Sequence, residues 1–228
     1  MEILHSSLVI LACLLGSLAE EDLQTNVFIF PESSNTAAVV LNASFQDPFT
    51  SVTVCLRSYT LLNRAYGLFS YATRKSDNEL LIFKPKPNQY NFYVGGTSVT
   101  FSVPERMTSG PQWEHICMSW ESATGLVEFW LDGQPLPRMG MKKGYSIGTG
   151  GSLLLAQDQD SVGGGFDINQ SFTGELTDVY MWDRVLTPDE VLLIRNGGTL
   201  SKYILNWRSL SYQIKGYVVV KPSLMTIY

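Results

Sequence analysis

Short runs of apolar and aromatic residues, separated by Gly, Pro and polar turns, fill this chain from residue 27 onward. In residues 52–57 polarity alternates, which predicts a strand with Val54 on one face and Cys55 on the other. Gly95-Gly96 joins two such runs as in a hairpin. The other runs expected to be strands are 27–30, 37–41, 66–71, 80–83, 89–94, 98–103, 114–120, 126–131, 153–155, 172–182 and 214–220. Short strands at this spacing predict an all-β antiparallel sandwich or jelly roll.

One helix is expected, from Pro188 to Arg195. Thr187 is placed to cap it, Pro188 takes the first helical position, and Glu190 completes a capping box. The pair Gly197-Gly198 would end it. The sequence has no internal repeat and no low-complexity linker, so residues 20–228 are expected to form one domain.

The N-terminus resembles a secretory signal peptide. Residues 8–15 form an apolar core too short to cross a bilayer, and residues 16–19 include the small side chains that signal peptidase recognises. Residues 1–19 are therefore predicted to be removed on export. The acidic Glu2 is unusual there, and the alternative is a buried N-terminal strand. Because no later run of about 20 apolar residues occurs, residues 20–228 are expected to be secreted without a transmembrane anchor.

Cys55 and Cys117 are the cysteines that remain after this cleavage, because Cys13 lies within residues 1–19. In an oxidising compartment they are expected to form a disulfide bond; the alternative is two buried thiols. Asn42 begins an Asn-Ala-Ser sequon and is a predicted glycosylation site. Asn169 begins a second sequon, which we expect to stay unmodified because a glycan there would lie within an acidic loop.

That acidic loop, residues 156–170, combines aspartates and glutamines with three consecutive glycines. Calcium binds about six to eight oxygen atoms from carboxylates, amides and carbonyls, and glycine lets a backbone bend towards such an ion. The loop is not an EF-hand, since Val162 and Gly164 stand where that motif needs an oxygen ligand and a glycine. A merely solvated loop is the alternative. The candidate ligands in the loop are Asp158, Gln159, Asp160, Asp167 and Gln170.

The side chains that most enzymes need are scarce. His115 is the single histidine after residue 19, and its place two residues from Cys117 favours a packing or hydrogen-bonding role. Zinc would need more His or Cys, and no phosphate loop or nucleophile elbow occurs. A glycosidase would need two carboxylates opposed across a cleft. We therefore expect no enzyme, and the net charge of −5 argues against nucleic acid and anionic membranes as partners.

Residues 115–122, His-Ile-Cys-Met-Ser-Trp-Glu-Ser, match the pentraxin signature: His, any residue, Cys, any residue, Ser or Thr, Trp, any residue, Ser or Thr. Further similar blocks are 68–71, 77–79, 127–130, 181–183 and 204–207. From about residue 27 to 222 the chain resembles the short pentraxin family. The resemblance implies a lectin-like two-sheet jelly roll with the helix on the face opposite the ligand site. It also implies a Cys55–Cys117 disulfide and a cyclic homo-oligomer, typically a pentamer.

The resemblance implies two adjacent calcium ions in each subunit. Carried onto this sequence, the family's ligands are Asp77, Asn78, Asp158, Gln159 through its backbone carbonyl, Asp160 and Gln170, with Asp167 near the second ion. Family members generally have Glu where this chain has Asp158. The side chain is shorter by one methylene, which predicts weaker calcium binding, most of all at the second ion.

Phe83 and Tyr93 are the ligand-binding residues that the resemblance implies; ordinary strand packing is their alternative. In the choline-binding branch of the family the head group lies over the Phe and faces a Glu, and Ser98 takes the place of that Glu here. Two aromatic rings attract a trimethylammonium group by about 1 kcal/mol. Without the carboxylate, phosphocholine is not expected to be selected over phosphoethanolamine-type head groups or anionic glycans.

The chain is therefore predicted to be a secreted, calcium-dependent pattern-recognition lectin of innate immunity and the acute phase. Several weak sites on one face of an oligomer would bind a surface together. The helix face would be free to engage complement or Fc receptors, as the family implies. The alternative is a calcium-stabilised structural protein that captures no small ligand, and Asp158 and Ser98 are the residues that favour it.

Overall fold

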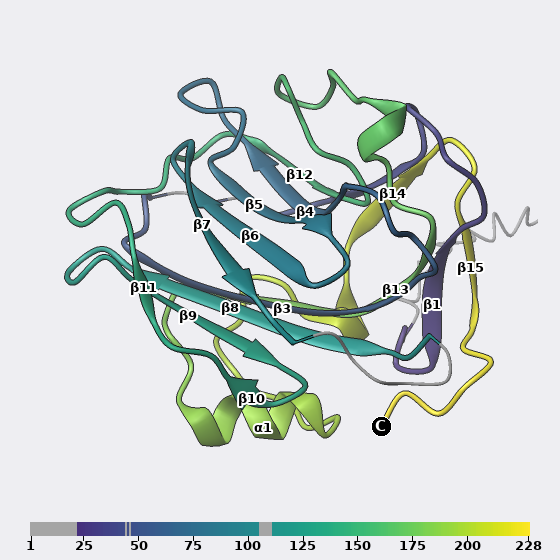
Figure 1. Ribbon diagram of the computed structural model, residues 1–228. Coiled ribbons are helices and arrows are strands. Elements are labelled where there is room, and N and C mark those ends of the chain that lie inside the picture. The colour runs from purple at the N-terminus through teal and green to yellow at the C-terminus, as the bar shows by residue number, and fades with distance from the viewer. Residues whose placement is uncertain (1–21, 44, 46, 105–110) are drawn as a thin grey trace, which may run out of the picture.

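Two stacked antiparallel sheets with one helix outside them make up the computed structural model (Figure 1). The structure describes residues 22–43, 45, 47–104 and 111–228, so the predicted signal peptide, 1–19, lies outside the described residues. The all-β sandwich predicted from the alternating runs is confirmed. No helix within the described ranges is long and apolar enough to cross a membrane.

Sheet A contains the first and the last strand in the sequence, together with strands from the middle of the chain. Its order is β10 (Gln134–Pro135), β9 (Leu126–Leu131), β8 (Glu114–Glu121), β3 (Ser51–Tyr59), β13 (Gly174–Trp182), β1 (Asn26–Phe30) and β15 (Val219–Pro222), with β11 (Met139–Gly140) also paired to β9. Sheet B has the order β14 (Tyr212–Lys215), β2 (Ala38–Leu41), β12 (Ser152–Leu155), β4 (Tyr66–Ala72), β5 (Leu80–Lys86), β6 (Gln89–Val94) and β7 (Thr97–Ser102). Two short 3-10 helices, η1 (Ile168–Gln170) and η2 (Trp207–Ser209), lie in loops.

Every predicted run contains a strand, but the run 214–220 was wrongly expected to be continuous. It is divided between β14 in sheet B and β15 in sheet A. Gly216 lies between them with a φ of 65°, in the left-handed region that favours glycine. The chain therefore turns there and passes from one sheet to the other.

The core fills the space between the sheets with large side chains such as Phe92 from sheet B and Trp120 from sheet A. Because successive side chains of a strand point to opposite faces, Val54 and Cys55 lie on opposite faces of β3, and both are buried. β3 is buried along nearly its whole length. Its second face is covered by the segment that carries helix α1, which lies below sheet A in Figure 1.

Helix α1 (Pro188–Arg195) has the predicted bounds. The Thr187 side chain accepts a hydrogen bond from the Glu190 N–H, and the Glu190 carboxylate accepts one from the Thr187 N–H at 2.9 Å, which completes the capping box. Gly197, with a φ of 78°, follows the last turn. Val191 and Ile194 are buried against the sheet, and burying such side chains stabilises a fold by roughly 1.5–3 kcal/mol each.

Cys55 and Cys117 lie directly opposite each other on β3 and β8 and form the predicted disulfide. His115 lies beside it, with Nε2 3.7 Å from the Cys117 sulfur. Burial and the nearby Arg57 and Arg195 lower the pKa of His115 to about 3. The imidazole is therefore neutral, in agreement with a packing role.

Candidate functional site

The acidic loop that follows β12 lies over the outer face of sheet B. The side-chain amide of Gln159 holds it there: Nε2 donates to the carbonyls of Ser70 and Ser152, both at 3.0 Å. Its Oε1 accepts from the Gly163 N–H at 2.7 Å. Since these bonds occupy the side chain within the protein, Gln159 has its backbone carbonyl left to offer a cation.

Two loops contribute acidic side chains to this face. Asp77 is exposed and Asn78 half-buried in the loop between β4 and β5, whereas Asp158 is 8 % exposed and Asp160 is exposed in the loop after β12. Burial raises the pKa of Asp158 to about 6, and the negative charges of Asp160 and Asp77 add to the increase. The predicted ligands Asp77, Asp158 and Asp160 are therefore close enough for their charges to interact.

Two oxygen atoms at this site are buried and have no hydrogen-bond partner among the described residues: Asn78 Oδ1 and Asp158 Oδ1. A buried polar atom without a partner is unfavourable by about 1–3 kcal/mol. Amide and carboxylate oxygens are the ligands that calcium prefers. The donor chemistry of the site therefore fits calcium.

A tighter group of potential metal ligands occurs elsewhere. In the part of the chain that the structure describes, Cys55, His115 and Cys117 have ligand atoms within 4.8 Å of one another. Both sulfur atoms belong to the disulfide, so this group does not form a metal site.

Asp167 and Gln170 lie at the two ends of η1. The Asp167 carboxylate accepts from the N–H of Asn169 at 2.9 Å and from its side-chain amide at 3.0 Å, so it caps this short helix. Gln170 is half-buried. Sequence reasoning missed the capping role, although Asp is a common helix N-cap that accepts from the backbone N–H two residues on. The role of Asp167 and Gln170 as calcium ligands stays a prediction.

The comparisons with known proteins agree with this arrangement. The model of the Pentaxin family matches residues 26–222. The chain belongs to this family. It is 48 % identical over 214 residues to the serum amyloid P-component of Bos taurus, covering 93 % of this chain and 94 % of that protein. It is 47 % identical over 217 residues to the C-reactive protein of Homo sapiens, covering 94 % and 96 %.

A solved structure supports the same assignment. The heptameric SAP-like pentraxin from Limulus polyphemus has a TM-score of 0.80 and 27 % identity, covering 90 % of this chain and 98 % of that one. Pentaxins such as these relatives are recognition proteins and not enzymes, and we assign this pentaxin to the same class.

Phe83 and Tyr93 of this pentaxin lie on the same outer face as the acidic loop. Ser70, which accepts a hydrogen bond from Gln159, pairs with Leu81, and Leu81 pairs with Tyr93. Phe83 is two residues from Leu81 and so shares its face. Tyr93 is half-buried, but Phe83 is only 8 % exposed, less than expected of a pocket wall.

Two further residues complete this face. Ser98 pairs directly with Tyr93 and is exposed. Asn91 pairs with Phe83, and its Oδ1 is buried without a partner among the residues described. Sequence reasoning missed Asn91, although strand alternation places it on the face of Tyr93 and could have indicated it.

Asn42, the predicted glycosylation site, is exposed directly after β2. Its side-chain amide donates to the Ser211 hydroxyl at 3.1 Å. The position is accessible, and its glycosylation stays a prediction. Asn169, in the second sequon, is also exposed.

Proposed function

We propose that this pentaxin is a secreted, calcium-dependent pattern-recognition lectin. The observation that carries the proposal is the pair of buried acceptor atoms, Asn78 Oδ1 and Asp158 Oδ1, which have no partner among the described residues. Asp77 and Asp160 act electrostatically on Asp158. Two calcium ions, held by these four residues, the Gln159 carbonyl, Gln170 and Asp167, would supply the positive charge that attracts a phosphate or carboxylate oxygen.

The proposed ligands are phosphocholine- or phosphoethanolamine-type head groups or anionic glycans. Tyr93 offers an aromatic surface on the face that carries the acidic loop. Ser98, its cross-strand partner, brings no charge. Contact with the ring and hydrogen bonds would therefore hold an ammonium or sugar group. Without a charge at Ser98, phosphocholine would not be strongly preferred over the other proposed ligands.

Assembly would multiply these weak contacts. We propose a cyclic homo-oligomer, expected to contain five subunits, that presents all its acidic loops on one face. The relative from Limulus polyphemus is heptameric, so the ring size can vary within the family. Helix α1 lies outside sheet A, away from the acidic loop (Figure 1). That face would be free to engage complement or Fc receptors.

Retention of the purified protein on phosphocholine and phosphoethanolamine beads tests the proposal. We expect retention with calcium and release by a chelator. Asp160→Asn should weaken retention, whereas Asp189→Asn removes a carboxylate on α1 that is also exposed and should not. The lectin proposal is wrong if the folded protein is retained equally with and without calcium. It is also wrong if the folded protein binds neither bead and does not bind an anionic glycan.

A further inference from the structure

Arg64 lies in the segment that joins β3 to β4, and its side chain ties this segment to the far end of the acidic loop. Its Nη1 donates to the carbonyls of Asn169 and Ser171, at 3.1 and 2.7 Å. Gln170, a proposed calcium ligand, stands between these two residues. One nitrogen atom therefore holds the backbone on both sides of Gln170.

The same guanidinium group reaches a third segment of the chain. Nη2 of Arg64 donates to the hydroxyl of Ser33, between β1 and β2, at 2.9 Å, and to that of Ser171 at 3.4 Å. The Ser171 hydroxyl in turn donates to the Ile168 carbonyl at 2.7 Å. A planar guanidinium offers several donors in a fixed geometry, which suits it to join distant segments at one point.

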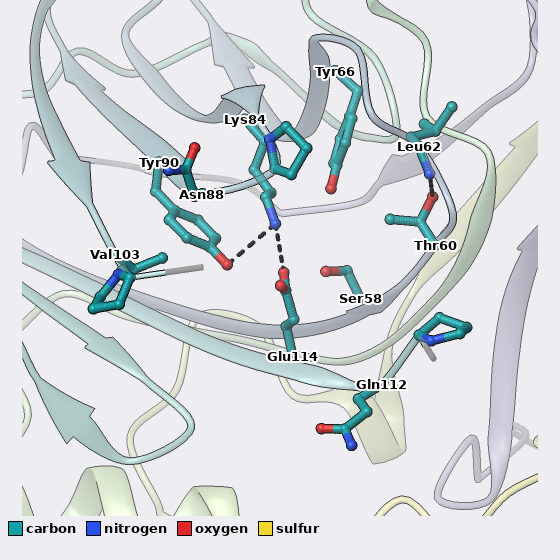
Figure 2. Close-up of a pocket in the computed structure, with 13 residues that line it drawn as sticks. Ser58, Thr60, Leu62, Tyr66, Lys84, Asn88, Tyr90, Val103, Gln112 and Glu114 are labelled. Atoms are coloured by element: carbon teal, nitrogen blue, oxygen red, sulfur yellow. Dashed lines mark hydrogen bonds and ion pairs between the residues drawn. The ribbon is translucent and has the colours of Figure 1, made fainter. Parts of the chain in front are cut away.

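The segment that carries Arg64 is itself anchored next to the end of the acidic loop. The Thr60 hydroxyl donates to the Thr173 carbonyl and accepts from the Leu62 N–H at 3.1 Å. Figure 2 shows the second of these bonds beside the hollow between the sheets, which Thr60 and Leu62 help to line. Arg64 therefore donates from a segment whose own position is fixed.

Polar contacts, and not apolar packing, hold the turn η1 in place. None of its residues is buried, and Ile168 is 46 % exposed. The Asp167 cap and the hydrogen bonds from Arg64 thus provide most of its support. The Gln170 side-chain amide makes no hydrogen bond to a described residue, so it remains available to an ion.

The charge of Arg64 and its hydrogen bonds should affect calcium in opposite directions. Its five hydrogen bonds to described residues all end at neutral oxygen atoms, so no acceptor among them balances its charge. A positive charge near a cation opposes the binding of that cation. Loss of the charge alone would therefore strengthen calcium binding, whereas loss of the hydrogen bonds would free Gln170 and weaken it.

We propose that Arg64 is a positioning residue for the calcium ion that Gln170 and Asp167 would hold. It fixes the backbone from which the Gln170 amide reaches the ion, as outer partners of metal ligands generally do. This inference rests on the proposed function, because it requires the acidic loop to bind calcium. None of the five hydrogen bonds reaches Asp77 or Asn78, so the ion that those two residues would hold should be little affected.

Calorimetric calcium titration of Arg64→Gln and Arg64→Lys tests this inference. The first substitution removes the charge, and the second keeps the charge but loses the planar set of donors. In both variants we expect the weaker binding step to weaken about tenfold and the tighter step to change little. Arg138→Gln is the control, since it removes an arginine that is paired with Glu128 on sheet A and should change neither step.

Hydrogen exchange in EDTA adds a measurement that does not depend on calcium. The N–H groups of Gln170 and Ser171 donate to the carbonyls of Asp167 and Ile168. Both should exchange faster in the two Arg64 variants than in the unchanged protein. Circular dichroism shows whether each variant folds, and the second variant decides the outcome if the first does not.

The inference is overturned if a folded Arg64 variant binds calcium as tightly as the unchanged protein, or more tightly. It is equally overturned if both binding steps weaken alike, which would indicate a general structural role, or if exchange at Gln170 and Ser171 is unaltered. In each of these cases the unchanged protein still binds calcium, so the lectin proposal stands. A complete lack of calcium binding by the unchanged protein would instead contradict both proposals.

Discussion

The backbone of Asp158 lies directly against Gly67 of β4. A methyl group on Gly67 would come within 2.8 Å of the Asp158 nitrogen and within 2.8 Å of the Gln157 carbonyl carbon. Real side-chain carbons essentially never come so close to backbone atoms. A glycine on one strand thus sets how closely the acidic loop approaches sheet B.

Gly67→Ala should lift the acidic loop and separate Asp158 from Asp77. We expect calcium binding to weaken at least about tenfold and the fold to lose roughly 1–3 kcal/mol, as overpacked sites do. Calorimetric calcium titration and thermal unfolding in EDTA measure the two effects. Gly148→Ala is the matched control, since its nearest neighbour would be a side-chain oxygen at 3.5 Å. If Gly67→Ala binds calcium as tightly as the unchanged protein, the close approach of Gly67 to Asp158 does not affect calcium binding.

Asp158→Glu should strengthen calcium binding, because one added methylene lets the carboxylate reach a second ion. We expect the weaker of two binding steps to tighten by about tenfold, which corresponds to roughly 1.4 kcal/mol. Asp158→Asn keeps the size of the side chain, removes its charge and should weaken both steps. Calorimetry that finds two equally tight ions in the unchanged protein would contradict the expectation.

Ser98→Glu should shift the preference towards phosphocholine. The new carboxylate would stand opposite Tyr93 on an exposed strand and attract the trimethylammonium group. An exposed ion pair contributes up to about 1 kcal/mol, or roughly fivefold in affinity. The measurement is the free phosphocholine concentration that elutes half of the protein from beads. Ser98→Gln has the same size without the charge, and an equal gain for it would exclude the electrostatic explanation.

His115 should make the protein sensitive to acid. Its pKa is lowered to about 3 in the fold, whereas an unfolded histidine has a pKa of about 6.5. Between these values the unfolded chain binds a proton that the fold does not, so stability falls as the pH drops from about 6.5 towards 3. The expected slope is at most about 1.4 kcal/mol per pH unit.

Urea unfolding in EDTA between pH 7 and pH 4 measures this slope. His115→Gln cannot titrate, so its stability should fall less steeply than that of the unchanged protein, even if it is lower at pH 7. Parallel curves for the two proteins would show that another group carries the acid sensitivity.

The elements could be predicted because their signals are local. Alternation marks each strand, and Thr187, Pro188 and Glu190 mark the start of α1 within four residues. The disulfide followed from having two cysteines after residue 19. The division of residues 214–220 between β14 and β15 could not be predicted from apolar content, because it depends on the conformation of Gly216.

The sites were harder to predict because they join distant strands. The acidic loop was evident from its composition and from the family resemblance, but the burial of Asp158 and Phe83 depends on how the loop lies on sheet B. The cavity between the two sheets, lined among others by Ser58, Lys84 and Glu114, left no local signal. Ser58, Lys84 and Glu114 belong to three strands, and strand register alone brings them together.

The position of β1 has a consequence for how this protein reaches its fold. Both neighbours of β1, β13 and β15, belong to the last quarter of the chain. An emerging chain therefore carries the apolar segment Val27–Phe30 with both edges unpaired until synthesis is almost complete. Pairings so distant in sequence are slow to form, and exposed strand edges promote aggregation meanwhile. The yield of native protein should therefore depend on how well the cell protects this first strand.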